Sequence, residues 1–216
     1  TAALVARGML ADEYGVAASD IIWRTGGVED PGRPEKVSLV LPPQFRVEPI
    51  PTEKSLSGML AEGELDALIA PLPPSCFTGK APHVGRLFPD FRKLEKDYFR
   101  RTGHFPIMHT VGIRASLVDQ YPWLAGNVFE ALCQAKDLAI PRLASYGAAK
   151  ATLPWLAAEV DETIAIMGED YWPYGFGPNR VALEAATRYS FEQGLTERKL
   201  DIEELFVPST LEQSKV

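Results

Sequence analysis

The beginning of the chain combines one helical pattern with two strand-like patterns. Apolar residues over positions 1–14 recur at helical spacing, and Gly15 is placed to end that helix. Two short apolar runs follow at residues 21–23 and 37–41, and each is flanked by Gly or Pro, as buried strands tend to be. A loop rich in Gly and Pro, residues 26–34, separates them. We therefore expect a helix followed by two buried strands.

The next part of the chain repeats the order of helix and strand. Thr52 is suited to cap a helix whose apolar residues share one face until Gly63 breaks the pattern. Residues 65–69, with the sequence LDALI, then have the pattern of a strand. Helix, glycine and strand in this order are typical of α/β proteins. Several prolines end this part, and we predict a lobe boundary or an exposed connection near residues 71–82.

The chain from residue 86 onward is predicted to be mostly helical. Residues 86–101 mix apolar and charged side chains as an amphipathic helix does, and residues 111–113 form a short strand-like run. Pro122 is placed to open a long helix whose apolar residues recur at near-helical spacing. A last helix is expected over residues 178–193, where Gly194 stops it. The complete pattern predicts an α/β protein.

Composition supports a folded, acidic protein. Hydrophobic residues make up 46% of the 216 positions, which is enough for a core. The 22 basic and 29 acidic side chains leave a net charge of −7, which disfavours nonspecific nucleic-acid binding. No apolar run reaches the roughly 18 to 20 residues that a membrane-spanning helix needs, so we predict no membrane span.

The cysteines, the first residue and the absence of known motifs narrow the chemistry. Cys76 and Cys133 lie far apart and outside any CxxC pattern, so we predict neither a disulfide framework nor a thiolate metal site. The chain begins with Thr1 inside an amphipathic segment, which indicates a processed chain, a cloned fragment or a missing upstream part. P-loop, GxGxxG, GxSxG and HExxH motifs are absent from the sequence. Because no spaced ligand motif is present, we predict no metal.

The segment 86–101 is locally positive in an acidic protein. Its six basic and three acidic side chains leave a charge of +3. Such a segment can attract a small anion. A solvated helix face explains the same pattern, and the sequence alone does not decide between the two.

Residues 100–109, RRTGHFPIMH, hold the densest group of candidate catalytic side chains: Arg101, Thr102, His104 and His109. The guanidinium fork of arginine matches a carboxylate with two parallel hydrogen bonds, and histidine can transfer a proton near neutral pH. A histidine in an apolar run is also often a satisfied core residue. The spacing by itself is therefore weak support for a site.

A second candidate is the aromatic loop over residues 168–180. Trp172 and Tyr174 in this loop can form the wall of a site for a planar ligand. In the alternative interpretation the loop is a lid that only covers the core, and Asn179 and Arg180 begin the following helix. Both interpretations fit the sequence.

Seven segments carry a resemblance to a known family: GGVEDPGRPEK (26–36), SLSGMLAEGELDALI (55–69), RLFPDF (86–91), RRTGHFPIMHTVGIR (100–114), LPWL (153–156), MGEDYWPYGFGPNR (167–180) and EQGL (192–195). They are similar to the 4,5-dihydroxyphthalate decarboxylases, and the likeness covers nearly the whole chain. Its most specific parts lie around His104–His109 and Tyr171–Arg180. The same broad family includes members described only as transporter-type binding proteins.

The resemblance implies the architecture of type II periplasmic binding proteins, which have two α/β lobes, a double crossover and a ligand cleft at the hinge. Residues 1–75 would then be the second lobe without its first strand, and residues 76–108 the connector and crossover. Residues 109–216 would be the C-terminal part of the first lobe with a helical tail. Because family chains begin well before the residue that matches Thr1, we expect the first lobe to be incomplete.

The reaction that the resemblance implies is loss of CO2 from 4,5-dihydroxyphthalate by protonation of the ring, which gives 3,4-dihydroxybenzoate during bacterial phthalate breakdown. We hypothesise that His109 or His104 delivers the ring proton, while the other histidine or Asp170 polarises the catechol. Arg101 and Arg114 would clamp the carboxylate that is retained.

The remaining candidate residues would complete the substrate site. Trp172 and Tyr174 would close over the ring, and Thr102, Asn179 and Arg180 are further candidate binding residues. The expected partner is a small aromatic dicarboxylate, with no nucleic acid, and a homo-oligomer is a further expectation. We expect a cytoplasmic enzyme without a cofactor. The alternatives are a non-catalytic solute-binding protein for a small carboxylate and an inactive remnant with an incomplete lobe.

Overall fold

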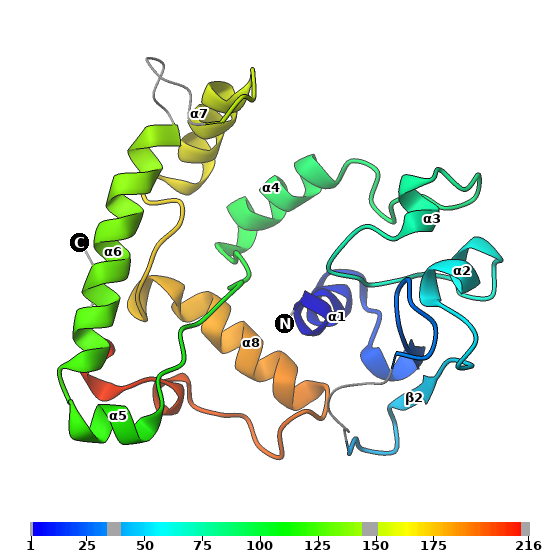
Figure 1. The fold of residues 1–216 in the computed structure, drawn as a ribbon, viewed down its shortest axis with the longest axis horizontal. Helices are drawn as coiled ribbons and strands as arrows, with labels where there is room; N and C mark the ends of the chain where they lie inside the picture. Colours follow the sequence, from blue (N-terminus) through cyan, green and yellow to red (C-terminus); the bar gives the residue numbers. More distant parts are fainter. Residues whose placement is uncertain (1, 34–39, 144–150, 213–216) are drawn as a thin grey trace. The chain divides into compact units, whose positions relative to one another are not determined.

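The computed structural model describes residues 2–33, 40–143 and 151–212 (Figure 1). It is a mixed α/β structure in which helices predominate and two short parallel strands form a small sheet. The chain divides into two compact units, Thr1–Pro89 with Ala186–Leu200 (unit 1) and Asp90–Ala185 with Asp201–Val216 (unit 2). Each unit is therefore made from two separate stretches of the chain.

Helix α1, Ala2–Tyr14, confirms the predicted first helix. Gly15 ends it with a φ of +68°, a conformation that a residue without Cβ adopts readily. Gly8 of this helix lies against Tyr189, because a Cβ atom at position 8 would be 2.3 Å from the Tyr189 ring. Tyr189 is 1% exposed, and its hydroxyl donates a hydrogen bond of 2.6 Å to the carboxylate of Asp12. This close approach anchors α1 within unit 1.

The sheet of unit 1 consists of β1 (Ile22–Thr25) and β2 (Arg46–Pro49), which pair in parallel. A short 3-10 helix, η1 (Ala18–Asp20), leads into β1. β1 confirms the existence of the strand predicted at residues 21–23, but its residues alternate between exposed and half-buried, so the prediction that this strand is buried is wrong. Because the strands are parallel and in register, their carboxyl ends lie side by side.

The partner of β1 is not the strand that the sequence pattern predicts. Residues 37–39 of the strand predicted at 37–41 lie outside the described residues, and Val40 and Leu41 are not in a strand. β2 takes the place of that strand further along the chain, and all four of its residues are exposed. An exposed strand lacks the apolar run that marks a buried one.

Helix α2, Leu56–Ala61, confirms the second predicted helix but begins at a different cap. The Ser55 hydroxyl, and not the predicted Thr52, accepts a hydrogen bond of 3.2 Å from the Gly58 N–H. Gly63 follows the helix with a φ of +76°, as a helix-ending glycine does. A one-turn helix, α3 (Ser75–Thr78), completes this part of unit 1.

The predicted strand at residues 65–69 is wrong, because the chain there is irregular. Leu65 and Leu68 pack against a core cluster of unit 1 instead of alternating between two faces of a sheet. That cluster consists of Ile50, Leu56 and Met59. The apolar residues of this stretch therefore serve the core without forming a strand.

Unit 2 is helical in its described part. Its elements are α4 (Phe91–Thr102), α5 (Ala115–Gln120), α6 (Leu124–Leu143), α7 (Leu156–Met167), η2 (Gly177–Asn179), the first residues of α8 (Arg180–Glu192), η3 (Ile202–Leu205) and η4 (Pro208–Thr210). Helices α4, α6 and α8 confirm the three helices predicted from residue 86 onward. Gly194 follows α8 with a φ of +69°, as predicted.

The strand predicted at residues 111–113 is also wrong, since the chain between α4 and α5 has no regular structure. Val111 is 64% exposed and has no neighbouring strand among the described residues of unit 2. The α4 and α7 helices are joined by ion pairs of Glu162 with Arg92 (2.8 Å) and Lys96 (2.5 Å). Helices α6 and α7 lie side by side (Figure 1).

The core of unit 2 gathers Phe176, Leu183 and Ile202, with Ile107, Phe206 and Leu211 packed against it. Its residues come from the aromatic loop, α8, η3 and the stretch that follows α4. Across the described residues, none of the helices combines the length and apolar character needed to cross a membrane.

Candidate functional site

The first predicted site segment turns sharply at the end of α4. Gly103 ends the helix with a φ of +63°, and the Thr102 hydroxyl donates a hydrogen bond of 2.8 Å to the Tyr98 carbonyl. The same hydroxyl accepts a hydrogen bond of 3.1 Å from the His104 N–H. Thr102 thus holds the turn that directs His104 inward, where it is only 4% exposed.

Tyr98 organises three of the predicted site residues. Its hydroxyl and Nδ1 of His104 are 2.5 Å apart and share a hydrogen bond, and the two rings meet edge to face. The guanidinium of Arg101 lies 5.7 Å from the centre of the Tyr98 ring, within range of a cation–π interaction. Sequence analysis missed Tyr98. Its position three and four residues before Arg101 and Thr102, on the same helix face, was the available signal.

The aromatic loop is held in shape by Asn179. Its Nδ2 donates two hydrogen bonds of 2.9 Å, one to the Pro173 carbonyl and one to the Gly175 carbonyl. Both amide hydrogens of Asn179 are therefore used within the loop, and they stabilise its conformation.

Lys136 on α6 contacts three residues of the aromatic loop. Its ammonium lies 2.6 Å from a carboxylate oxygen of Asp170, donates to the Trp172 carbonyl at 3.2 Å, and lies 5.2 Å from the Tyr174 ring centre. The Lys136 side chain is 9% exposed. Sequence analysis missed this lysine, because nothing local to α6 connects it with a loop more than thirty residues away.

The two predicted site segments meet within unit 2. The ring of Phe105 contacts the ring of Trp172, and Ile107 packs against the core that contains Phe176. We call Tyr98 with Arg101, Thr102 and His104 the Tyr98 cluster, and Lys136 with Asp170, Trp172 and Tyr174 the Lys136 cluster. Phe105 directly follows His104, so the contact of Phe105 with Trp172 connects the two clusters. The structure therefore links two groups of predicted residues through this contact. One group is Arg101, Thr102 and His104, and the other is Asp170, Trp172, Tyr174 and Asn179.

The other three predicted residues are placed differently. His109 and Arg114 are exposed, and among the described residues neither forms a hydrogen bond or ion pair with the two clusters. Arg180 pairs with Glu203 at 2.8 Å and with Glu184 at 3.3 Å, and its guanidinium lies 5.0 Å from the Phe176 ring centre. The hydrogen bond that Arg180 donates to Glu203 is the main cause that raises the pKa of Arg180 above its ordinary value.

The described residues offer little for a metal ion. Within ranges 2–33, 40–143 and 151–212, no three His, Cys, Asp or Glu side chains converge as ligands. Cys133 is buried, Cys76 is partly buried, and they form no disulfide. A cavity of about 170 Å³ lies in unit 1, and none of the predicted site residues lines it.

Comparison with known proteins identifies two similar sequences, while no family model matches the chain. The chain is 41% identical to a 4,5-dihydroxyphthalate decarboxylase of Comamonas testosteroni over all 216 residues, which span 66% of that protein. It is 46% identical to a 4,5-dihydroxyphthalate decarboxylase of Pseudomonas putida over 100 residues, which are 46% of this chain and 39% of that protein. The chain therefore spans just under two thirds of the first relative and aligns with a smaller part of the second.

Proposed function

Because the chain belongs to the 4,5-dihydroxyphthalate decarboxylase family, we propose that the complete protein removes CO2 from 4,5-dihydroxyphthalate and gives 3,4-dihydroxybenzoate in phthalate degradation. The observation that carries this proposal is the 41% identity along all 216 residues. The contact between the two predicted site segments in unit 2 supports it, because it gathers histidine, arginine, carboxylate and aromatic side chains in one region.

The chemical difficulty of this reaction lies in the electron pair that CO2 leaves behind. Direct loss of CO2 would place that pair on the ring as an aryl carbanion. If the ring carbon that bears the carboxylate is protonated first, the C–C bond breaks and its electron pair restores aromaticity. Each carboxylate is para to a hydroxyl, and that oxygen, once deprotonated, pushes electrons to the ring carbon. The substrate is then its own electron sink, and we propose that no cofactor is needed.

The protein must supply an acid for the ring carbon, a base for the para hydroxyl and cations that hold the neighbouring carboxylate. We assign the acid to His109 or His104. The other histidine or Asp170 polarises the catechol. Arg101 and Arg114 clamp the retained carboxylate, with the fork geometry that suits arginine.

The contacts in unit 2 favour different kinds of role for the two histidines. His104 is buried and bonded to Tyr98, which suits a residue held in one orientation. His109 is exposed and has no described hydrogen-bond partner, which suits a residue that meets the substrate. Trp172 and Tyr174 cover the ring in this proposal, and Lys136 fixes the loop that carries them.

We also propose that the complete protein has the two-lobed architecture of type II periplasmic binding proteins. The division of the chain into two compact units, each formed from two separate stretches, supports this proposal. The two thiols without a disulfide fit a reducing compartment, so we propose a cytoplasmic enzyme. Homo-oligomerisation is part of the same proposal and is tested by the mass of the protein in solution.

The test is direct. The complete protein is incubated with 4,5-dihydroxyphthalate, and CO2 and 3,4-dihydroxybenzoate are measured together. We expect equal amounts of both products, and a chelator should leave the rate unchanged. Tight binding without any CO2 would contradict the proposal and favour a solute-binding protein.

A further inference from the structure

The connection between α4 and α5 contains a stretch of backbone without hydrogen bonds to the described residues. From Phe105 to Ile113, none of the N–H or C=O groups is bonded to another group within ranges 2–33, 40–143 and 151–212. Figure 1 shows this stretch as an irregular link between the two helices. We call residues 105–113 the unpaired segment.

Both ends of the unpaired segment are held within unit 2. The Phe105 ring contacts the Trp172 ring with centroids 5.4 Å apart, and Ile107 packs against the core of the unit. At the other end, the Arg114 carbonyl accepts a hydrogen bond of 2.9 Å from the Leu117 N–H in the first turn of α5. The middle of the segment therefore lies between two fixed ends.

Apolar side chains of the unpaired segment are exposed. Met108 is 50% exposed and Val111 is 64% exposed. The segment, FPIMHTVGI, contains no Asp, Glu, Lys or Arg, although these residues make up 24% of the chain. Proteins commonly protect an open strand edge with charged side chains, so an apolar edge without them indicates a surface that another segment covers.

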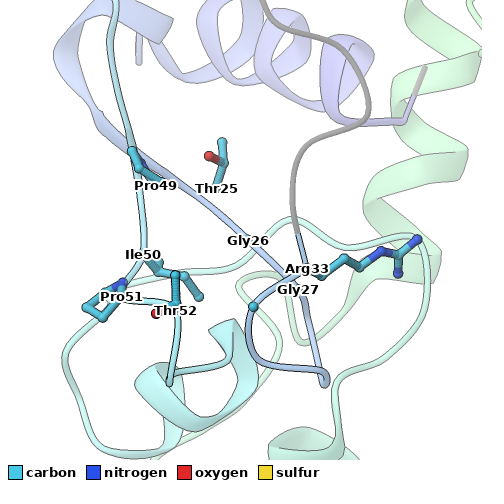
Figure 2. A pocket seen from close by; sticks show the side chains of 9 residues that line it. Thr25, Gly26, Gly27, Arg33, Pro49, Ile50, Pro51 and Thr52 are labelled. Atoms are coloured by element: carbon cyan, nitrogen blue, oxygen red, sulfur yellow. The ribbon is translucent and has the colours of Figure 1, made fainter.

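A pairing partner is what makes a strand of such a segment, as β2 illustrates. The four residues of β2 are exposed, and they form a strand because β1 lies beside them. Figure 2 shows Thr25 and Pro49, which are in register where the two strands end. Just beyond, the Ile50 N–H donates a hydrogen bond of 2.9 Å to the Thr25 carbonyl. Residues 111–113 have a strand-like sequence but no such partner in the described part of the chain.

The length of a family member points to the source of that partner. The 216 residues span 66% of the Comamonas testosteroni relative, so about one third of that protein lies outside the matched part. A second copy of this chain is a weaker candidate, because each copy carries a net charge of −7 and the two would repel each other. A segment of the same chain has the high effective concentration of an intramolecular partner.

We propose that the unpaired segment is an edge to which the complete protein adds a β-strand from outside residues 1–216. The backbone of the added strand supplies the ladder of hydrogen bonds, and its apolar side chains cover Met108 and Val111. This edge depends on the family membership of the chain and on the geometry of unit 2, and not on the reaction that the protein catalyses.

Hydrogen exchange of the complete wild-type protein tests the backbone. The amides of residues 107–113 should exchange at least about tenfold more slowly than in an unstructured chain, because the ladder hydrogen bonds protect them. Exchange at the rate of an unstructured chain overturns the proposal.

Photo-crosslinking of the complete protein identifies the added strand. The variant is Val111→p-benzoylphenylalanine, and the same replacement at Val181 on α8, which is 51% exposed, gives the background of an exposed site. We expect crosslinks from position 111 to residues of the same chain outside 1–216. Mixed isotope-labelled and unlabelled protein separates these from crosslinks between copies. Crosslinks between copies, crosslinks only within residues 1–216, or none above background overturn the proposal.

A lysine at position 111 tests whether the surface is covered. Val111→Lys should lower the urea midpoint of the complete protein by about 1 M, because a covered lysine without a partner is costly. Val181→Lys is the matched control and should leave the midpoint unchanged. Equal midpoints of the two variants overturn the proposal. These measurements use no substrate, so a protected and crosslinked edge without CO2 release keeps this inference and removes only the proposed function.

Discussion

The rings of Phe105 and Trp172 meet edge to face, with their centroids 5.4 Å apart. This contact joins the segment that ends α4 to the aromatic loop before α8, two segments that are distant in sequence. Phe105 follows His104, and Trp172 lies two residues after Asp170. A single aromatic contact therefore connects the surroundings of a buried histidine with those of a paired carboxylate.

Removing that contact should lower activity more than stability. Phe105→Ala should reduce kcat/KM for CO2 release roughly twofold to tenfold, because the aromatic contact that aligns the two segments is lost. The rate of CO2 release checks this. Phe191→Ala is the matched control, since Phe191 is 46% exposed and Phe105 is 40% exposed. Equal rates in the two variants would show that the contact does not align the site.

The ion pair of Lys136 and Asp170 should give a measurable coupling free energy in a double-mutant cycle. The variants Lys136→Met, Asp170→Asn and the double variant form a cycle, and urea denaturation gives the unfolding free energy of each. We expect a coupling of about 1 kcal/mol, because the lysine is largely buried while the carboxylate is half exposed. Strictly additive effects would mean that the pair contributes nothing to folding.

The hydrogen bond of Tyr98 with His104 is predicted to hold the buried imidazole. Tyr98→Phe keeps the ring but removes the partner of Nδ1, at a cost of about 1–3 kcal/mol in unfolding free energy. Nitrogen NMR shifts of His104 should change in the same variant. Tyr121→Phe is the control, because Tyr121 is 40% exposed. A Tyr98→Phe variant as stable as this control contradicts the prediction.

The pH dependence of unfolding should include Glu29. The main cause that lowers the pKa of Glu29 is the hydrogen bond that the Ser75 hydroxyl donates to its carboxylate. The Ser75 N–H donates a second hydrogen bond, of 2.7 Å, to the same carboxylate. A lowered folded-state pKa gives stability that is present above the ordinary value of 4.5 and is lost as the pH falls below it. The urea midpoint of the wild type should therefore fall with acidification.

Glu29→Gln should remove that part of the acid dependence, because glutamine does not titrate in this range. The measurement is the urea midpoint between pH 6 and pH 3 for wild type and variant. A control, Glu13→Gln, changes a carboxylate on α1 away from Ser75. Identical curves for wild type and Glu29→Gln would show that ionisation of Glu29 does not contribute to the acid dependence of stability.

The helices were predictable from sequence because their signals are local. Gly15 and Gly194 both adopt positive φ at the ends of helices whose apolar residues already show the helical period. The strands were harder to predict from sequence. β2 consists of Arg46, Val47, Glu48 and Pro49, all exposed, and it is a strand only because it pairs with β1. Residues 65–69 have the pattern of a strand, yet their leucines pack on a core cluster without a partner strand.

The site was predictable only where its residues are close in sequence. Arg101, Thr102 and His104 come from one short motif, and the structure gathers them around Tyr98. Lys136 approaches Asp170 only after α6 and the aromatic loop have folded together, so no local pattern reveals it. The individual roles of His109 and Arg114 stay predictions, because no contact among the described residues connects them with the two clusters.

The two hydrogen bonds of Asn179 have a consequence for ligand binding. By bonding to the Pro173 and Gly175 carbonyls, Asn179 closes the loop on itself without help from any ligand. Trp172 and Tyr174 are thereby preorganised, and a planar molecule that reaches them loses little affinity to ordering of the loop. Most of the entropy cost of ordering this loop arises when the protein folds, and not when a ligand binds.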